Sequence, residues 1–412
     1  MIKVLELDFE TYGSVELRGQ DSVGVYNYMF HPDTMILMAG YRLPGEEEVK
    51  LWQPHGGIVP IPVGLADAIL NPNVMILSYN STFERYGIKR LLGLTIPISR
   101  FIDPQVYSRS LSMPGKLEID CDVLDLPQEL AKDSRGEELI DLFCQPHKAK
   151  KVKGQPEKYV RYDHLSHSKE WEEFCNYCKQ DIRAEAELLR RQTILGVYPQ
   201  TPFERRLWEW DQMVNDRGLP VNVEFVTKAY ALATRSKKED LEKQNKITGL
   251  ANANSRDQLL PWVKARGYPF NTLRSDTVKA VLKDPEVKLT DECREVLKAR
   301  TAASSTAYQK LKAILRQVCD DGRLRNQFLF LGSPRCGRWA GNAVQLHNLA
   351  RPMVLGKTDA NPDGYDFEKP EVLAEARALV LGEKYDEIKA RYGSVLLTIK
   401  CLIRTAFDTE GV

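Results

Sequence analysis

The chain has 412 residues, enough for two or three domains that each have a hydrophobic core. Its 43% hydrophobic and 28% charged residues are ordinary for a globular protein, and a net charge of +1 gives no global attraction to nucleic acid. The charged start, MIKVLELDFE, is unlike a signal peptide. Lys400 and Arg404 interrupt the longest apolar run, so we expect no membrane segment. The eight cysteines show no disulfide spacing, which favours a reduced, cytoplasmic protein.

The first 195 residues are predicted to form an α/β domain, because short apolar runs alternate with helical stretches. Residues 2–9 and 73–80 have the pattern of strands, and residues 83–94 that of a helix. Residues 147–161 are basic and contain Gly-Gln-Pro, as an exposed loop does, and a solvated loop is favoured over a DNA contact. A clear helix follows over residues 171–191.

Residues 196–412 are predicted to form a second, mostly helical part, with the main boundary at Gly196, Pro199 and Pro202. One predicted helix has a stripe of apolar side chains from Phe203 to Val214 and ends at Gly218. A long helix is predicted over residues 291–319, and the sequence RNQFLFLG is typical of a strand.

Two carboxylates lie two residues apart in the first predicted strand. Asp8 and Glu10 therefore project from one face of the sheet, a few ångströms apart. Oxygen ligands at that spacing suit Mg²⁺ or Mn²⁺, although a solvated strand end is the favoured explanation of this pair taken alone.

Two further segments carry residues suited to the same chemistry. Asn80, Phe83 and Glu84 lie where a strand meets a helix, and Glu84 could either join the metal site or only favour the helix dipole. Tyr177 and Asp181 are four residues apart, so they share one helix face at the edge of the apolar stripe. A phenol there could hold a water while a carboxylate reaches a metal, and an edge-of-core tyrosine beside a solvated acid is the alternative.

The order Asp-x-Glu, Asn-x-x-Phe-Glu and Tyr-x-x-x-Asp resembles the three motifs of the DEDDy group of 3′→5′ exonucleases. The resemblance implies an RNase-H-like fold, a mixed sheet flanked by helices. It also implies that Asp8, Glu10, Glu84 and Asp181 hold two Mg²⁺ or Mn²⁺ ions while Tyr177 orients the attacking water. The family more often has aspartate at the place of Glu84. The insert from Phe101 resembles that of phage-type polymerase exonucleases, in which an aspartate (here Asp103) begins a helical segment without a catalytic role.

The second half resembles family A DNA polymerases. The sequence NANSRDQLL is similar to a stretch ahead of the thumb, and SPRCGRWAGNAVQLHNLAR is similar to a segment that contacts the primer–template duplex. The resemblance implies DNA contacts, through phosphates and minor-groove base edges, from these residues: Arg335, Arg338, Gln345, His347, Asn348 and Arg351. Asn80 and Phe83 of the second exonuclease motif are also expected to contact DNA. Cys336, His347 and Ala350 depart from the family pattern.

The last stretch, RYGSVLLTIKCLIRTAFDTEGV, resembles the segment just before the first catalytic palm motif. We therefore expect residues 196–412 to be a partial polymerase domain without palm aspartates, fingers or nucleotide incorporation of its own. A second polypeptide carrying palm and fingers is an expected partner, and a phage or prophage protein inside a bacterial host is the expected source.

Three functions are weighed on these motifs. The leading prediction is a proofreading 3′→5′ DNA exonuclease joined to part of a polymerase, acting on a single-stranded 3′ end and on primer–template duplex. The first alternative is a non-catalytic primer–template-binding subunit of a split polymerase. The second is an exoribonuclease of the same DEDD group. The spacing of Cys175 and Cys178 is found in zinc sites, but the sequence has no second cysteine pair or histidine cluster at ligand spacing. We therefore interpret both cysteines as core residues.

Overall fold

The computed structural model describes residues 2–127, 130, 135–149, 157–196, 201–303 and 306–407. The chain forms two compact units. The first consists of residues 1–218 and 325–345, and the second of residues 219–324 and 346–412. This division differs from the predicted boundary at residue 196, because the helix over 202–217 and the segment 325–345 lie with the first unit. No helix in the described residues is long and apolar enough to cross a membrane.

The first unit contains a mixed sheet, which in the described residues has five strands in the order β3-β2-β1-β4-β5. Its strands are β1 (Lys3–Tyr12), β2 (Met35–Arg42), β3 (Lys50–Trp52), β4 (Val74–Leu77) and β5 (Phe101–Ile102). β1 pairs antiparallel with β2 and parallel with β4, while β3 is antiparallel to β2 and β5 parallel to β4.

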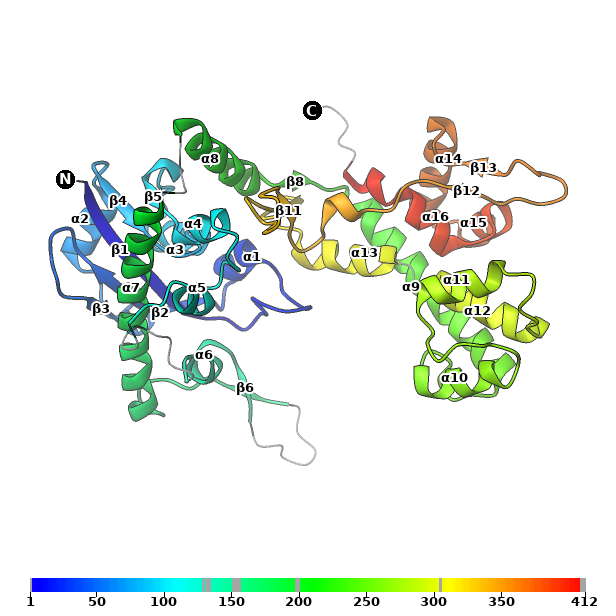
Figure 1. The fold of residues 1–412 in the computed structure, drawn as a ribbon, viewed down its shortest axis with the longest axis horizontal. Helices are drawn as coiled ribbons and strands as arrows, with labels where there is room; N and C mark the ends of the chain where they lie inside the picture. The colour runs from blue at the N-terminus through cyan, green and yellow to red at the C-terminus, as the bar shows by residue number, and fades with distance from the viewer. Residues whose placement is uncertain are drawn as a thin grey trace. The chain divides into compact units, whose positions relative to one another are not determined.

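Helices flank this sheet, and α7 crosses β1 and β2 in Figure 1. The helices of this unit are α1 (Val25–Phe30), α2 (Val63–Leu70), α3 (Thr82–Leu92), α4 (Pro104–Ser110), α5 (Leu117–Val123), α6 (Gly136–Cys144), α7 (Ser168–Leu195) and α8 (Pro202–Arg217). The short strand β6 (His147–Lys148) pairs with β7 (Tyr159–Val160), and β10 (Phe328–Leu329) pairs with β11 (Ala340–Gly341). The predicted mixed sheet with flanking helices is confirmed.

The alternation of β1 gives the sheet two different faces. Leu5, Leu7 and Phe9 are buried in one core cluster. The intervening acidic residues face the opposite side, where α7 crosses the sheet and supplies Phe174 and Cys178 to a second cluster.

The boundary differs from the prediction because α8 is tied to the first unit by buried polar contacts. Arg85 of α3 forms an ion pair with Asp216, and Arg205 donates a hydrogen bond to the carbonyl oxygen of Phe101 at 2.6 Å. The helix ends at Gly218 as predicted. Its predicted stripe is not its packed face, because Phe203 and Trp210 are 61% and 62% exposed.

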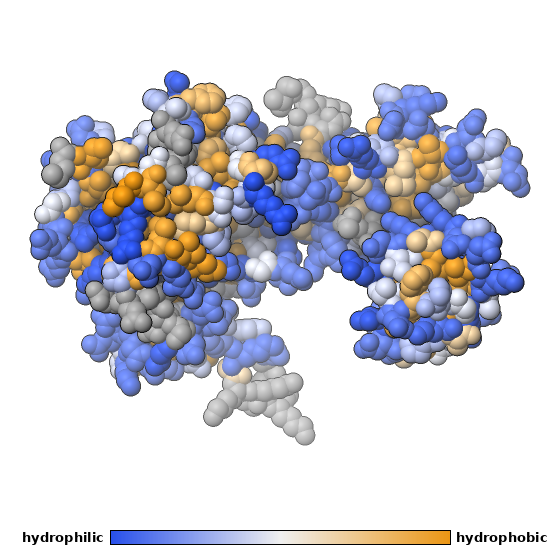
Figure 2. All heavy atoms as spheres, viewed as in Figure 1, coloured by the Kyte–Doolittle hydropathy of each residue, from blue (hydrophilic) through white to orange (hydrophobic). Residues whose placement is uncertain are grey.

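The second unit is mostly helical, as predicted, and in Figure 2 hydrophilic side chains cover much of both units while apolar ones show in patches. Its helices are α9 (Val223–Thr248), α10 (Arg256–Lys264), α11 (Ser275–Lys283), α12 (Asp291–Ala303), α13 (Thr306–Gln317), α14 (Pro370–Leu381), α15 (Tyr385–Tyr392) and α16 (Val395–Leu402). Its short strands are β8 (Leu219–Pro220), β9 (Arg323–Leu324), β12 (Val354–Leu355) and β13 (Tyr365–Asp366). The helix predicted over 291–319 is described as two, α12 and α13, and residues 304 and 305 between them lie outside the described residues.

Candidate metal centre

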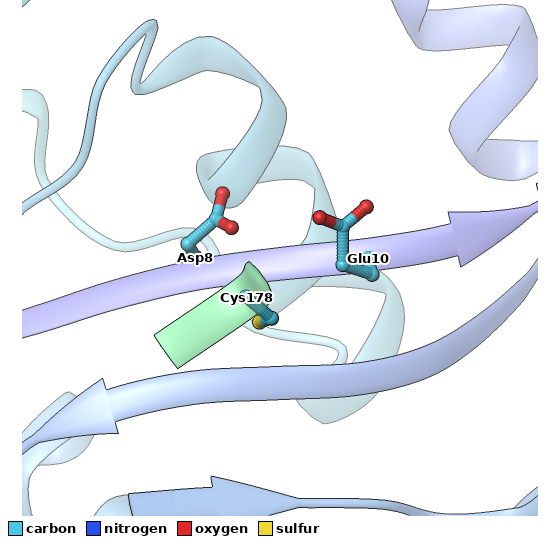
Figure 3. A group of neighbouring side chains, drawn as sticks. All are labelled: Asp8, Glu10 and Cys178. Atoms are coloured by element: carbon cyan, nitrogen blue, oxygen red, sulfur yellow. The ribbon is translucent and has the colours of Figure 1, made fainter. Parts of the chain in front are cut away.

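The site begins with two carboxylates on one strand. Asp8 and Glu10 are half-buried on the same face of β1, as the alternation predicts. Figure 3 shows both side chains rising from this strand, with Cys178 of α7 beside them. One ligand atom from each of these three residues lies within 4.8 Å of the other two. Glu6, on the same strand face, is neutralised by Arg42, whose guanidinium nitrogen lies 2.7 Å from the Glu6 carboxylate.

A glycine lets α7 approach this strand face closely. Gly40 of β2 is the register partner of Asp8. A Cβ atom at Gly40 would lie 2.9 Å from the Cys178 sulfur and 3.1 Å from Ile182 Cγ1. Any larger residue would therefore hold α7 farther from Asp8.

Glu84 enters the site from the first turn of α3 and is only 2% exposed. Its carboxylate accepts a hydrogen bond from the backbone N–H of Phe9, the residue between Asp8 and Glu10. The Oε2 atom of Glu84 has no hydrogen-bond partner. Burial, and then the charge of Asp8, raise the pKa of Glu84 well above its usual range.

Tyr177 and Asp181 come from successive turns of α7. Both are buried, at 4% and 8% exposure, rather than at the edge of the packed surface as the sequence suggested. The Tyr177 hydroxyl is hydrogen-bonded to the Asp181 carboxylate, and burial, Asp181 and Glu10 all raise the pKa of Tyr177. Gly136 lies against the ring, since a Cβ there would be 2.3 Å from Tyr177 Cε2.

Cys178 lies at the site as a buried thiol. Burial, and then the charges of Asp8 and Glu10, raise the pKa of this thiol well above the usual range. Its side chain is fully buried in the cluster under α7, while Cys175 is half-buried. The sequence-based interpretation of the pair as core residues therefore agrees with their packing.

One further carboxylate of this site, Glu185, was not predicted from the sequence. It is 3% exposed on α7, and its Oε2 accepts a hydrogen bond from the backbone N–H of Tyr79 at 3.1 Å. Burial and the charges of Asp8, Glu84 and Asp181, in that order, raise its pKa well above the usual range. The signal was present, because Glu185 follows Asp181 by four residues and so shares its helix face.

The residues present suit a hard divalent cation. Several carboxylates on β1, α3 and α7 raise each other's proton affinity, and a cation would reverse this effect and give Glu84 Oε2 a partner. The predicted ligands are Asp8, Glu10, Glu84 and Asp181. Asp8 and Glu10 belong to the group of ligand atoms within 4.8 Å of one another, and Glu84 and Asp181 do not. An all-oxygen set favours Mg²⁺ or Mn²⁺ over softer metals.

The predicted DNA-contacting residues fall into separate groups. Asn80 is exposed and Phe83 half-buried at the start of α3, next to the acidic cluster. Arg335, Arg338 and Gln345 are exposed on the first unit. The remaining three are exposed on the second unit and are His347, Asn348 and Arg351. The structure thus divides the predicted duplex-binding segment between the two units.

The basic loop is described only in part. Lys148 pairs with Glu157 at 3.2 Å, and residues 150–156, including Lys150, Lys151 and Lys153, lie outside the described residues.

Comparison with known proteins gives one relative over the whole chain. The chain is 30% identical over 411 residues to the DNA polymerase of Bacillus phage SP02, an alignment that covers 100% of this chain and 58% of that protein. The chain therefore spans little more than half of its relative and is homologous to that part of a phage DNA polymerase. No family model matches the chain.

Among solved structures, the polymerase domain of Pol1 from M. smegmatis, in complex with a DNA primer-template and dNTP, matches with a TM-score of 0.47 and 13% identity. That match covers 87% of this chain and 54% of the other.

Proposed function

We propose that this chain is the 3′→5′ exonuclease portion of a DNA polymerase and removes nucleotides from a DNA 3′ end. One observation supports the proposal: the β1 carboxylates Asp8 and Glu10 interact electrostatically with the buried Tyr177 hydroxyl, which is hydrogen-bonded to Asp181 of α7, and Asp8 also interacts with the buried Glu84 of α3. Homology to the phage SP02 DNA polymerase supports the polymerase context and DNA as the substrate.

In this proposal Asp8, Glu10, Glu84 and Asp181 hold two divalent cations, Mg²⁺ or Mn²⁺. When bound, such ions lower the pKa of a water and offset charge on the phosphate and the leaving oxygen. The protein's contribution is to hold the reacting groups in place. Glu84 is fixed by the Phe9 N–H, and the Tyr177 hydroxyl, oriented by Asp181, directs the water toward the phosphorus. The reaction forms no covalent intermediate with the protein.

The two units receive different roles in this proposal. The first, with its mixed sheet and acidic cluster, is the RNase-H-like exonuclease domain. The second is part of a family A polymerase domain that holds primer–template DNA, with phosphates bound by arginines such as Arg351 and base edges by Asn348. Both side chains are exposed to solvent.

The test is degradation of a 5′-labelled single-stranded DNA by the purified full chain in Mg²⁺, in Mn²⁺ and in EDTA. We expect a ladder of products shortened from the 3′ end with either metal and none in EDTA. The double variant Asp8→Asn, Asp181→Asn should abolish it, whereas Asp67→Asn, at an exposed position on α2, should not.

Other outcomes separate the alternatives. A chain that binds primer–template but never shortens it would be the non-catalytic subunit. Faster hydrolysis of a matched RNA than of DNA would favour the exoribonuclease. Undiminished activity in the double variant would overturn the metal-ligand assignment.

A further inference from the structure

The turn between β4 and α3 is held by carboxylates at three consecutive backbone amides. Tyr79 N–H donates to Glu185 Oε2 at 3.1 Å. Asn80 N–H and Ser81 N–H each donate to Asp103, both at 2.9 Å. Asn80 has a positive φ of 61°, a left-handed conformation that asparagine tolerates better than most non-glycine residues.

Both carboxylates that hold this turn are buried, Asp103 at 6% and Glu185 at 3% exposure. A buried carboxylate is costly unless hydrogen bonds compensate it. Asp103 has several such hydrogen bonds, since it also accepts from the Ser81 hydroxyl at 3.0 Å and from Gln105 N–H at 3.0 Å. The backbone N–H of Tyr79 provides the corresponding hydrogen bond to Glu185.

These contacts belong to a closed frame. Asp103 caps α4. From α7, Gln192 Nε2 donates to the Ser108 hydroxyl of α4 at 2.8 Å and to the carbonyl oxygen of Pro104 at 3.2 Å. Glu185 of α7 accepts the hydrogen bond from the Tyr79 N–H and so connects this helix to the turn. The frame therefore joins α7, α4 and the turn without using any proposed metal ligand.

Two of the proposed ligands are carried by the two segments that this frame joins. Asp181 is one helical turn before Glu185 on α7, and Glu84 is five residues after Tyr79. The hydrogen bond from Tyr79 to Glu185 is thus a short link between the elements that carry them. A shift of about 1 Å at a reacting site can cost about 100-fold in rate, so a link of this kind can control catalysis.

We propose that Glu185 is a positioning residue, which fixes the separation of Glu84 and Asp181 by accepting the Tyr79 N–H. This inference rests on the proposed exonuclease function. It assigns Glu185 no contact with substrate. The role depends on an acceptor oxygen at this place and not on negative charge, which distinguishes it from a fifth metal ligand.

The experiment compares Glu185→Gln, which keeps an acceptor oxygen without charge, with Glu185→Leu, which removes both. Glu172→Gln, at an exposed position on the same helix, is the matched control. For each full-length protein we would measure kcat and KM on labelled single-stranded DNA, the Mn²⁺ concentration for half-maximal rate, Mn²⁺ binding without DNA, and amide hydrogen exchange over residues 77–83.

We expect Glu185→Gln to keep kcat within about threefold. Glu185→Leu should lose kcat by about 10- to 100-fold, with KM changed less than about twofold. Exchange over residues 77–83 should accelerate in Glu185→Leu only, while exchange in β1 stays slow and shows that the variant is folded. Mn²⁺ binding should weaken in the same variant.

Two results would overturn the positioning role. If Glu185→Gln lost kcat and Mn²⁺ affinity as severely as Glu185→Leu, the charge would matter and Glu185 would be a ligand. If Glu185→Leu kept normal kcat and exchange, the link would be unimportant. Should the wild-type chain degrade no nucleic acid, the proposed function would fail, and exchange and Mn²⁺ binding would still decide whether Glu185 holds the turn.

Discussion

Trp339 donates its indole N–H to Asp211 across 2.7 Å, and this bond fixes the segment 325–345 to α8 within the first unit. Asp211 is 4% exposed and also accepts from Gln212 at 3.0 Å and Asn215 at 3.2 Å. Burial nevertheless raises the pKa of this carboxyl to about 6. The segment that carries Arg335, Arg338 and Gln345 is therefore anchored on a group that changes charge in mildly acidic solution.

This anchor predicts a pH-dependent stability. The folded protein keeps a proton on Asp211 up to about pH 6, whereas the unfolded chain loses it near 3.8. A raised folded-state pKa stabilises the fold fully below the unfolded value, and this contribution is lost as pH rises from about 4 to about 6, by about 2 to 3 kcal/mol. We would measure the free energy of unfolding of the wild type and of Asp211→Asn at several pH values. The advantage of the wild type should shrink over this range, and a constant difference would contradict the prediction.

Gly40→Ala should disturb the acidic site from outside it. The new Cβ would lie 2.9 Å from the Cys178 sulfur and 3.1 Å from the Cys178 carbonyl oxygen, so α7 must move away from β2. We expect a loss of stability of about 1 to 3 kcal/mol together with slower hydrolysis, because Asp181 moves with the helix. Thermal unfolding and the labelled-DNA assay would measure the two effects.

The matched control for that variant is Gly64→Ala on α2, where the nearest atom would be Leu43 Cδ1 at 3.2 Å. It should leave hydrolysis unchanged. Adding Cys178→Ala to Gly40→Ala should restore part of the stability, since it removes the sulfur but not the carbonyl contact. Full activity in Gly40→Ala would show that the close approach of α7 is not required.

Tyr177 can be tested through its neighbour as well as directly. Gly136→Ala would place a Cβ 2.3 Å from the Tyr177 ring and displace it, while Tyr177→Phe removes only the hydroxyl. Both should slow hydrolysis by about 100-fold if the hydroxyl orients the water. Gly136→Ala should lower the thermal midpoint more than Tyr177→Phe does, and thermal unfolding of both variants would measure the difference. Normal activity of Tyr177→Phe would remove this residue from the mechanism.

Glu84→Gln should change stability and activity in opposite directions. Burial and the charge of Asp8 penalise ionised Glu84, and glutamine resembles its protonated form. We expect the metal-free variant to be about 1 kcal/mol more stable at neutral pH, yet about 100-fold slower in hydrolysis, because a site selected for function stores unfavourable charge. Calorimetry in EDTA and the nuclease assay in Mn²⁺ would test this. Equal loss of both properties would point to misfolding instead.

Local patterns were enough to predict the elements that carry the site. The alternation in β1 placed Asp8 and Glu10 on one face, and the helical spacing placed Tyr177 and Asp181 on one side of α7. These predictions succeed because each concerns residues within one element, whose geometry is fixed by backbone hydrogen bonding.

Contacts between distant elements could not be predicted in this way. The role of Asp103 depends on a turn more than twenty residues before it, although its place at the start of a helix was visible. The stripe on α8 was misleading, since Asp211 and Asn215 are buried while Trp210 is exposed. An interpretation based on hydrophobic periodicity places polar residues in solvent. Polar residues that are buried can be recognised only from their hydrogen-bond partners in the folded chain.

The path of the backbone between the two units has a practical consequence. The polypeptide passes between them at residues 218/219, 324/325 and 345/346, so three covalent connections join them. Because each unit consists of two stretches of chain, the two pieces made by cutting one connection would still pack together within a unit. A recombinant fragment that stops at Gly218 would lack Trp339 and leave the buried Asp211 without that donor, so exchanging the first unit between homologues would require transplanting residues 325–345 with it.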